Sequence, residues 1–246
     1  MRGVLYVSHG SRVDEATSEA VNFIELVKKQ VDVPLQETCF LELTQPNLSQ
    51  GFQRLVDKGA MEISVIPVLL LSAGHYFKDI PKEIQLNQQK YPEIQVNYGK
   101  PLGVQQRLTE ILHQRLEETH ISLNTDAKVL LVGRGSYNPQ TQKDLSTIKS
   151  QLSKLNVELD IDVCYLAACK PSFETALDEA VKKGHSQIFV IPYLWFTGIL
   201  ERHIATTISN YHVDNDIVLC SRLGSHRHLQ IALKERVDET FEPIKQ

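Results

Sequence analysis

The sequence lacks the cysteine pairs and the long apolar runs that mark metal–thiolate, disulfide-bonded and membrane proteins. Its four cysteines form no CxxC pair and have neither zinc-ribbon nor ferredoxin spacing: Cys39, Cys164, Cys169 and Cys220. The first residues have no long apolar region typical of a signal peptide, and the longest apolar run, residues 63–74, is too short to span a bilayer. We therefore expect a soluble, cytoplasmic protein with reduced, buried thiols and no membrane partner.

An excess of positive charge is also missing. The 26 Lys and Arg residues are outnumbered by 30 Asp and Glu residues, for a net charge of −4, so no overall basic field would attract nucleic acid. There is no GxxxxGK[ST] loop, which argues against ATP hydrolysis, and no GxSxG elbow. The segment GRGSY (residues 133–137) lacks the GxGxxG spacing of a dinucleotide site. We expect no nucleic-acid partner.

What the sequence does contain is one unit that occurs twice, 125 residues apart. Gly10-Ser11 recurs as Gly135-Ser136, and CFLELTQP (residues 39–46) recurs as CYLAACKP (164–171). The same offset relates the residues Lys58-Gly59 and Lys183-Gly184, 65–67 and 190–192, and Gly99 and Gly224. Agreement of all these blocks in one register indicates an internal duplication.

Each copy alternates between strand-like and helix-like segments. In the first copy we expect buried strands at residues 3–8, 34–43, 61–71 and 94–98, and helices at 13–30, 44–59, 78–91 and 103–118. Thr44 is the expected N-cap of the second helix. Four strand–helix units in each copy predict a mainly parallel four-stranded sheet with helices on both faces.

The fold class is therefore α/β, with two similar domains that arose by duplication. A polar, turn-rich boundary at residues 120–128 predicts an N-terminal domain at 1–122 and a C-terminal domain at 123–246, facing each other across a cleft. Ligands of open parallel sheets bind beyond the carboxyl ends of the strands, so polar residues at those ends are the candidates for a site.

Three such residues follow successive strands of the first copy: His9, Glu42 and His75. Two imidazoles and one carboxylate form a plausible ligand set for a divalent transition metal. Taken singly, each residue is weak evidence, because a histidine at a strand end is more often structural than a ligand, and Glu42 could cap the helix that begins near Pro46.

The second copy serves as an internal control. The positions of His9, Glu42 and His75 are occupied there by Arg134, Ala167 and Leu200, whereas the glycines and prolines around them are kept. If the fold required the trio, the second copy should have kept at least one member. The joint loss favours a functional site in the N-terminal copy.

With these residues in view, the chain resembles the sirohydrochlorin chelatase family (CbiX/SirB type), a class of tetrapyrrole chelatases that work without ATP. The resemblance rests on VSHGSR (residues 7–12), FLEL (40–43) and PVLLLSAGHYFKDIP (67–81), and it covers essentially all 246 residues. It implies a class II chelatase-like fold and insertion of a divalent metal, Fe²⁺, into sirohydrochlorin to form siroheme. Some cobalt-type members carry a histidine-rich or cluster-binding C-terminus. Residues 236–246 contain neither feature, which favours iron.

The resemblance also implies roles for residues. His9 would be a metal ligand and the proton acceptor, His75 the second ligand, and Glu42 a carboxylate that assists the metal or the substrate. The macrocycle would contact residues of the first and third strand ends: Gly10, Ser11, Leu70, Leu71, Ser72, Ala73, Gly74 and His75. Because the substrate carries eight carboxylates, Arg134 is a candidate to bind one of them. Weaker candidates are Arg12, Lys78, Lys170 and Arg202.

Alternatives remain open on the sequence alone. The metal could be Co²⁺, for cobalamin synthesis, or Ni²⁺, because imidazole and carboxylate ligands accept several metals. A non-catalytic carrier of metal or tetrapyrrole could use the same ligands. A phosphohistidine hydrolase is disfavoured, because Ser8 stands where such enzymes have an arginine. We expect no permanently bound cofactor, and a chain with two domains can act as a monomer.

Overall fold

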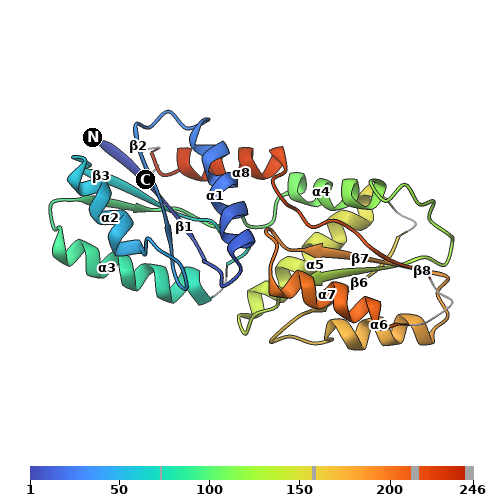
Figure 1. Ribbon diagram of the computed structural model, residues 1–246. Coiled ribbons are helices and arrows are strands. Elements are labelled where there is room, and N and C mark those ends of the chain that lie inside the picture. The colour runs from blue at the N-terminus through green and yellow to red at the C-terminus, as the bar shows by residue number, and fades with distance from the viewer. Residues whose placement is uncertain (73, 157–158, 212–215, 242–246) are drawn as a thin grey trace. The chain divides into compact units, whose positions relative to one another are not determined.

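The structure, a computed structural model, describes residues 1–72, 74–156, 159–211 and 216–241. In this part of the chain there are two sheets, each of four parallel strands with helices on both faces (Figure 1). The predicted class, two similar α/β domains built from a duplicated unit, is confirmed. None of the described helices is both long enough and apolar enough to cross a membrane.

The two sheets have the same strand order. The first runs β2-β1-β3-β4 and the second β6-β5-β7-β8. The strands are β1 (Arg2–Ser8), β2 (Leu35–Phe40), β3 (Glu62–Pro67), β4 (Gln95–Tyr98), β5 (Lys128–Gly133), β6 (Asp160–Tyr165), β7 (Gln187–Tyr193) and β8 (Asp216–Leu219). In the first sheet β2 lies on one side of β1 and β3 on the other, and β6 and β7 lie in the same way on the two sides of β5. A topological switch point therefore lies next to β1 and next to β5.

The helices follow in chain order. They are α1 (Asp14–Lys28), α2 (Leu48–Asp57), the single π-turn η1 (His75–Asp79), α3 (Ile80–Lys90), α4 (Gln106–Glu117), α5 (Pro139–Leu155), α6 (Phe173–Lys182), α7 (Ile199–Ser209) and α8 (Arg227–Asp238). The π-turn η1 occurs in the first copy, and the corresponding segment of the second copy is the continuous α-helix α7.

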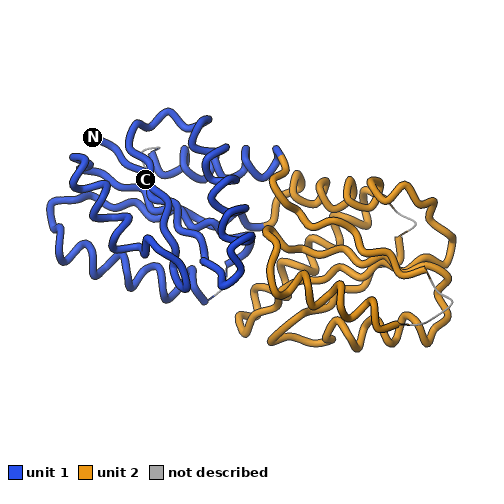
Figure 2. Tube along the Cα trace, in the orientation of Figure 1, with its two compact units in different colours: residues 1–103, 227–246 blue, residues 104–226 orange. Residues whose placement is uncertain are grey.

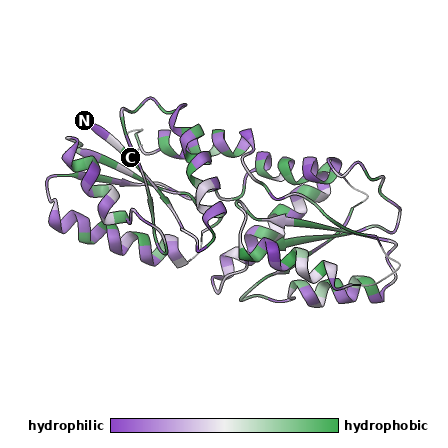
Figure 3. Cartoon of the chain, viewed as in Figure 1, coloured by the Kyte–Doolittle hydropathy of each residue, from purple (hydrophilic) through white to green (hydrophobic). Residues whose placement is uncertain are grey.

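The strands are apolar because helices cover both of their faces. Val4, Leu5, Tyr6 and Val7 of β1 are fully buried, and Figure 3 shows the strands of both sheets as the most hydrophobic parts of the chain. One face of the first sheet packs against α2 and α3, and the matching face of the second packs against α6 and α7. Each sheet therefore has its own core and holds its strand ends in fixed positions.

The two compact units differ from the two sequence repeats, because the last helix of each repeat belongs to the other repeat's compact unit. One unit comprises Met1–Gly103 and Arg227–Gln246, and the other comprises Val104–His226 (Figure 2). Helix α4, from the end of the first repeat, packs on α5 and β7, and α8, from the end of the second repeat, packs on α1 and β3. The predicted ranges 1–122 and 123–246 thus follow the repeats, whereas each compact unit takes its last helix from the other repeat.

Matching arginines hold the two exchanged helices in place. The Nη2 of Arg236 on α8 donates a hydrogen bond to the carbonyl oxygen of Leu102 at 2.6 Å. The Nη2 of Arg115 on α4 donates to the carbonyl oxygen of Leu223 at 2.9 Å. Both loops follow the last strand of a sheet, so each exchanged helix closes one unit by the same contact.

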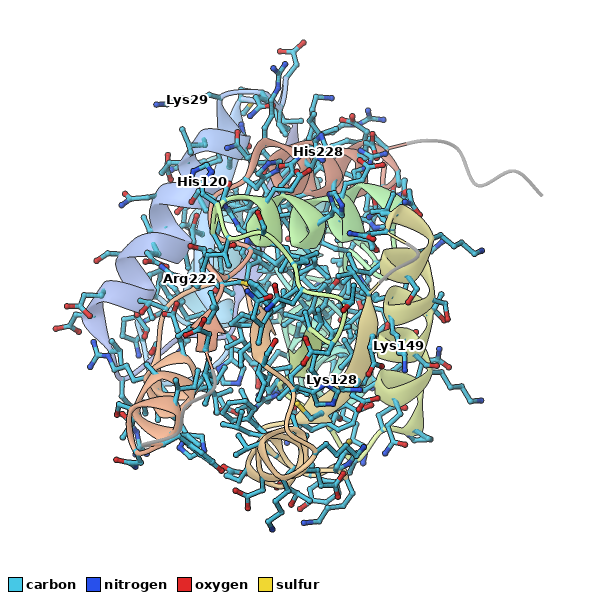
Figure 4. All side chains as sticks on the ribbon, turned by 90° about the vertical axis from the view of Figure 1, so that its right-hand side faces the viewer. Lys29, His120, Lys128, Lys149, Arg222 and His228 are labelled. Atoms are coloured by element: carbon cyan, nitrogen blue, oxygen red, sulfur yellow. The ribbon has the colours of Figure 1, made fainter. Side chains whose placement is uncertain are left out.

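Lys128, at the amino end of β5, is buried and bound by carboxylates. Its Nζ lies 2.9 Å from Asp160 and 2.6 Å from Asp162, and Lys149 of α5 approaches Asp162 at 3.8 Å (Figure 4). Burial raises the pKa of Asp162, but the hydrogen bond and charge of Lys128 outweigh it and hold that pKa below its ordinary value. These groups lie at the amino end of the second sheet, where they neutralise one another's charge.

One local prediction is wrong. Helix α2 begins after Asn47, not Thr44, and Asn47 and Gln50 form a capping box in which each side chain accepts the other residue's backbone N–H. The hydroxyl of Thr44 is instead 3.3 Å from the backbone nitrogen of Ser11 and 3.2 Å from its carbonyl oxygen. Thr44 therefore joins the loop after β1 to the loop after β2.

Candidate functional site: a histidine pair at the strand switch point

The loops after β1 and β2 are joined through their backbones. The N–H of Leu41 donates to the carbonyl oxygen of Ser8 at 2.9 Å, and the N–H of Glu42 donates to that of His9 at 3.0 Å. Between them, Gly10 has a φ of +89°, and a Cβ at this position would lie 1.9 Å from the Glu42 carbonyl oxygen. Only glycine fits this corner, which fixes the backbone of His9.

The second copy has the same corner with different side chains. Leu166 and Ala167 donate to the carbonyls of Gly133 and Arg134 at 3.0 and 2.9 Å. Gly135 has a φ of +83°, and its Cβ would lie 1.8 Å from the Ala167 carbonyl oxygen. The corner therefore forms without the side chains of His9 and Glu42. Because the fold does not require these two side chains, they are candidates for a functional role.

His75 meets His9 at the switch point between β1 and β3. Their Nε2 atoms are 3.0 Å apart, and the two rings meet edge to face with centroids 4.6 Å apart. His75 begins η1, where the Ile80 N–H reaches back to the His75 carbonyl, a spacing of five residues. Such π-turns are rare and often occur at functional sites. Both side chains remain partly open to solvent.

The Nδ1 atom of each ring, on the side away from the other histidine, lies next to an oxygen that can accept a hydrogen bond but cannot donate one. His75 Nδ1 lies 2.8 Å from Asp79 Oδ2, and His9 Nδ1 lies 3.2 Å from the Gly10 carbonyl oxygen. The hydrogen-bond network therefore assigns the proton of each neutral ring to Nδ1. The two Nε2 lone pairs then face each other, an arrangement that binds a shared proton or a metal cation.

Aromatic residues support η1 from β4. The hydroxyl of Tyr98 donates to the carbonyl oxygen of Tyr76 at 2.9 Å, and the two rings stack with centroids 5.0 Å apart. Burial raises the pKa of Tyr98 well above its ordinary value, so this hydroxyl remains a donor. Phe77, on the same turn, is 54% exposed. Tyr98 therefore fixes the backbone next to His75.

The structure brings together His9 and His75, but not the whole predicted trio. Glu42 is exposed, and its carboxylate does not complete a metal site: within the described residues, no group of three or more His, Cys, Asp or Glu side chains could hold a metal ion. Strand β2 ends at Phe40, so Glu42 lies two residues into the loop, attached to His9 through the backbone.

The other predicted residues lie around this corner. Leu70, Leu71 and Ser72 are half-buried, Gly74 is exposed, and Ala73 is outside the described residues. Ser11 accepts the Val13 N–H through its hydroxyl at 3.0 Å. Arg134 follows β5 in the other unit, where its side chain is exposed.

The sequence analysis missed Asp79 and Tyr98. A signal for Asp79 was present, because it lies four residues after His75 in a segment with helical spacing, which places the two on one helical face. Tyr98 carries no local signal, because its contact with Tyr76 depends on the position of β4 beside β3.

The comparison with protein families matches both repeats. The model of the CbiX family matches residues 3–119 and again residues 128–240. This chain belongs to the CbiX family. The double match also agrees with the duplication seen in the sequence and in the two sheets.

Individual proteins of known kind also resemble the chain over nearly its whole length. The sirohydrochlorin ferrochelatase of Priestia megaterium is 43% identical over 238 residues, which cover 96% of this chain and 90% of that protein. A sirohydrochlorin cobaltochelatase of the same species is 36% identical over 250 residues, covering 98% and 81%. The structure of SirB from Bacillus subtilis with Fe³⁺ has a TM-score of 0.88 at 36% identity, covering 97% of this chain and 95% of that one.

Proposed function

We propose that this chain inserts Fe²⁺ into sirohydrochlorin, without ATP, to form siroheme. The observation that carries the proposal is the pair of Nε2 atoms 3.0 Å apart at the switch point of the first sheet. It is supported by the similarity to a sirohydrochlorin ferrochelatase over 96% of the chain. The metal is a substrate in this reaction.

Insertion requires that a metal ion lose water and that two pyrrole N–H protons leave the macrocycle. Neutral imidazoles can do both, since they bind divalent metals and titrate near neutral pH. His9 and His75 hold the metal through Nε2. When the metal moves to the ring nitrogens, His9 Nε2 is released, accepts the first pyrrole proton, passes it on and then accepts the second. Glu42, whose backbone N–H donates to the His9 carbonyl oxygen, offsets the metal's charge and relays each of the two protons outward.

The macrocycle binds over the residues that follow β1 and β3. Leu70, Leu71, Ser72, Gly74 and His75, with Gly10 and Ser11, supply the contact surface. Leu43 and Phe77 are apolar side chains that are 55% and 54% exposed, as a binding site for a flat aromatic ring requires. The N-terminal repeat thus carries the metal. Arg134, which replaces His9 in the second copy, is the candidate to bind a substrate carboxylate.

The test is an anaerobic assay without ATP, in which purified protein, sirohydrochlorin and Fe²⁺ are mixed and the absorption of the macrocycle is followed. We expect insertion to be faster than in the protein-free mixture and to continue over many turnovers. Tight, stoichiometric binding without acceleration would indicate a carrier instead. Arg134→Ala should weaken sirohydrochlorin binding and leave metal binding unchanged. Equal affinity for sirohydrochlorin would remove Arg134 from the site.

Cobalt insertion is the second candidate, favoured by the similarity to a cobaltochelatase over 98% of the chain. The same assay with Co²⁺, under matched metal concentrations, ranks the two metals by kcat/KM. We further propose that the protein acts in the cytoplasm as a monomer, with sirohydrochlorin as its partner and no resident cofactor. Light scattering during size-exclusion chromatography tests the oligomeric state, since a dimer would double the mass from 27.9 kDa.

A further inference from the structure

We propose that Asp79 is a positioning residue, which fixes the tautomer and orientation of His75 and through them the metal affinity of the histidine pair. This role deepens the proposed function. It rests on that function only for the later insertion of the bound metal into the tetrapyrrole, and not for metal binding itself. Its basis is the 2.8 Å contact between Asp79 Oδ2 and His75 Nδ1, together with the 3.0 Å contact between His75 Nε2 and His9 Nε2.

The carboxylate decides which nitrogen of His75 carries the proton. A neutral imidazole has one N–H and one lone pair, and an ionised carboxylate can only accept. With the proton on Nε2, the Nδ1 lone pair would face the negative charge of Asp79. With the proton on Nδ1, that clash becomes a charge-assisted hydrogen bond, and the Nε2 lone pair points at His9. Metal-binding histidines are commonly oriented by a carboxylate in this way.

The local backbone holds Asp79 where this contact forms. Asp79 ends the π-turn that His75 begins, so both side chains project from one turn. That turn is fixed from outside by the hydrogen bond from Tyr98 to the Tyr76 carbonyl. The carboxylate itself is 50% exposed, so it is not part of the core. Its removal should leave the packing of the first sheet intact.

The second copy shows that the fold does not need this aspartate. At the offset of 125 residues, His75 corresponds to Leu200 and Asp79 to Ile204. Ile204 is fully buried in the core of the second unit, and α7 forms there as an uninterrupted helix. The copy that lacks the histidines therefore has an apolar core residue at the position of Asp79. This pattern is that of a site residue.

The test compares wild type with Asp79→Ala and Asp79→Asn in the full chain, without tetrapyrrole. Nitrogen-15 NMR of the imidazoles reports the His75 tautomer, calorimetry measures Co²⁺ binding, and thermal unfolding checks the fold. Glu117→Ala is the matched control, because Glu117 lies four residues after His113, with 3.6 Å between carboxylate and Nδ1. In wild type we expect His75 with its proton on Nδ1.

In Asp79→Ala we expect His75 to lose its preference for the Nδ1 proton and the dissociation constant for Co²⁺ to rise about 10- to 100-fold. Asp79→Asn keeps an acceptor oxygen, so it should retain the tautomer and lose less affinity. Glu117→Ala should match wild type. An unchanged tautomer in Asp79→Ala, wild-type affinity for Co²⁺, or failure of this variant to fold would each overturn the proposal. If wild type binds Co²⁺ yet inserts no metal, the proposed function fails and the role of Asp79 stands.

Discussion

The Nε2 atoms of His9 and His75 lie 3.0 Å apart, although the residues are separated by 66 positions in the sequence. Their meeting follows from the strand order, because β3 pairs with β1 in register and both strands end at the same edge of the sheet. When both rings are neutral and carry their protons on Nδ1, the outer nitrogens donate to oxygen acceptors and the pair presents two lone pairs to one point.

Loss of either histidine should abolish metal binding but not folding. In His9→Ala and His75→Ala one of the two Nε2 ligands is gone, and insertion should fall roughly 10²- to 10⁴-fold if that nitrogen also handles a proton. The melting temperature should stay close to that of wild type, since both side chains are partly exposed. Calorimetry with Co²⁺ and thermal unfolding are the measurements. His113→Ala is the control, and a large loss of stability in either variant would mean that the histidine is structural.

Gly10→Ala and Gly135→Ala should destabilise the protein by similar amounts. Both glycines have positive φ and face a carbonyl oxygen less than 2 Å from the position of a Cβ, so each variant should cost at least about 1–3 kcal/mol. Only Gly10→Ala should also weaken Co²⁺ binding, because only Gly10 fixes a histidine. Urea unfolding and calorimetry measure the two effects. Equal loss of Co²⁺ affinity in both variants would contradict the assignment of the site to the first copy.

The exchanged helices should stabilise the unit on which they pack. Leu233 of α8 and Leu112 of α4 are both fully buried, so truncation to alanine should cost roughly 2–5 kcal/mol at either position. Hydrogen exchange should then quicken in β1–β4 for Leu233→Ala and in β5–β8 for Leu112→Ala. The opposite pattern, with each variant loosening its own sequence repeat, would show that the helices are not exchanged in solution.

Three of the buried thiols, those of Cys39, Cys164 and Cys220, should be inert in the native protein. Burial raises the pKa of Cys164 and of Cys220 to about 12 and that of Cys39 still further. At pH 8 a thiol with a pKa of 12 is ionised in about one molecule in ten thousand, and only the thiolate is nucleophilic. Iodoacetamide at pH 8 should therefore modify none of these three cysteines until urea unfolds the chain, as mass spectrometry would detect. Rapid native modification of Cys164 would show that the second sheet opens in solution.

The duplication, the sheets and the histidine pair could be predicted because their signals are local. Continuous apolar strands, glycines such as Gly59 and Gly184 at helix ends, and a fixed offset between the two copies are all visible in the sequence. The joint replacement of His9, Glu42 and His75 in the second copy favoured a site in the N-terminal copy. Two of the three side chains, those of His9 and His75, are in contact.

What could not be predicted depends on contacts between distant segments. The apolar face of α4 indicates that the helix is buried, but it does not indicate which of the two sheets covers it. The packing of α4 on the second sheet could therefore not be predicted from the sequence. Thr44 has the residue type of an N-cap, yet its hydroxyl bonds to Ser11, and the helix starts after Asn47. Glu42 lies in the loop and not in the strand, because β2 ends at Phe40, three residues earlier than expected, and the next residues bond to the backbone at the end of β1.

The central claim is that the histidine pair inserts metal into a tetrapyrrole. The most direct measurement is the anaerobic rate of Fe²⁺ insertion into sirohydrochlorin without ATP, compared between wild type, His75→Ala and a protein-free mixture. We expect a catalysed rate with many turnovers for wild type and a rate for folded His75→Ala close to that of the protein-free mixture. A wild-type rate no faster than the protein-free mixture, or full activity in His75→Ala, would contradict it.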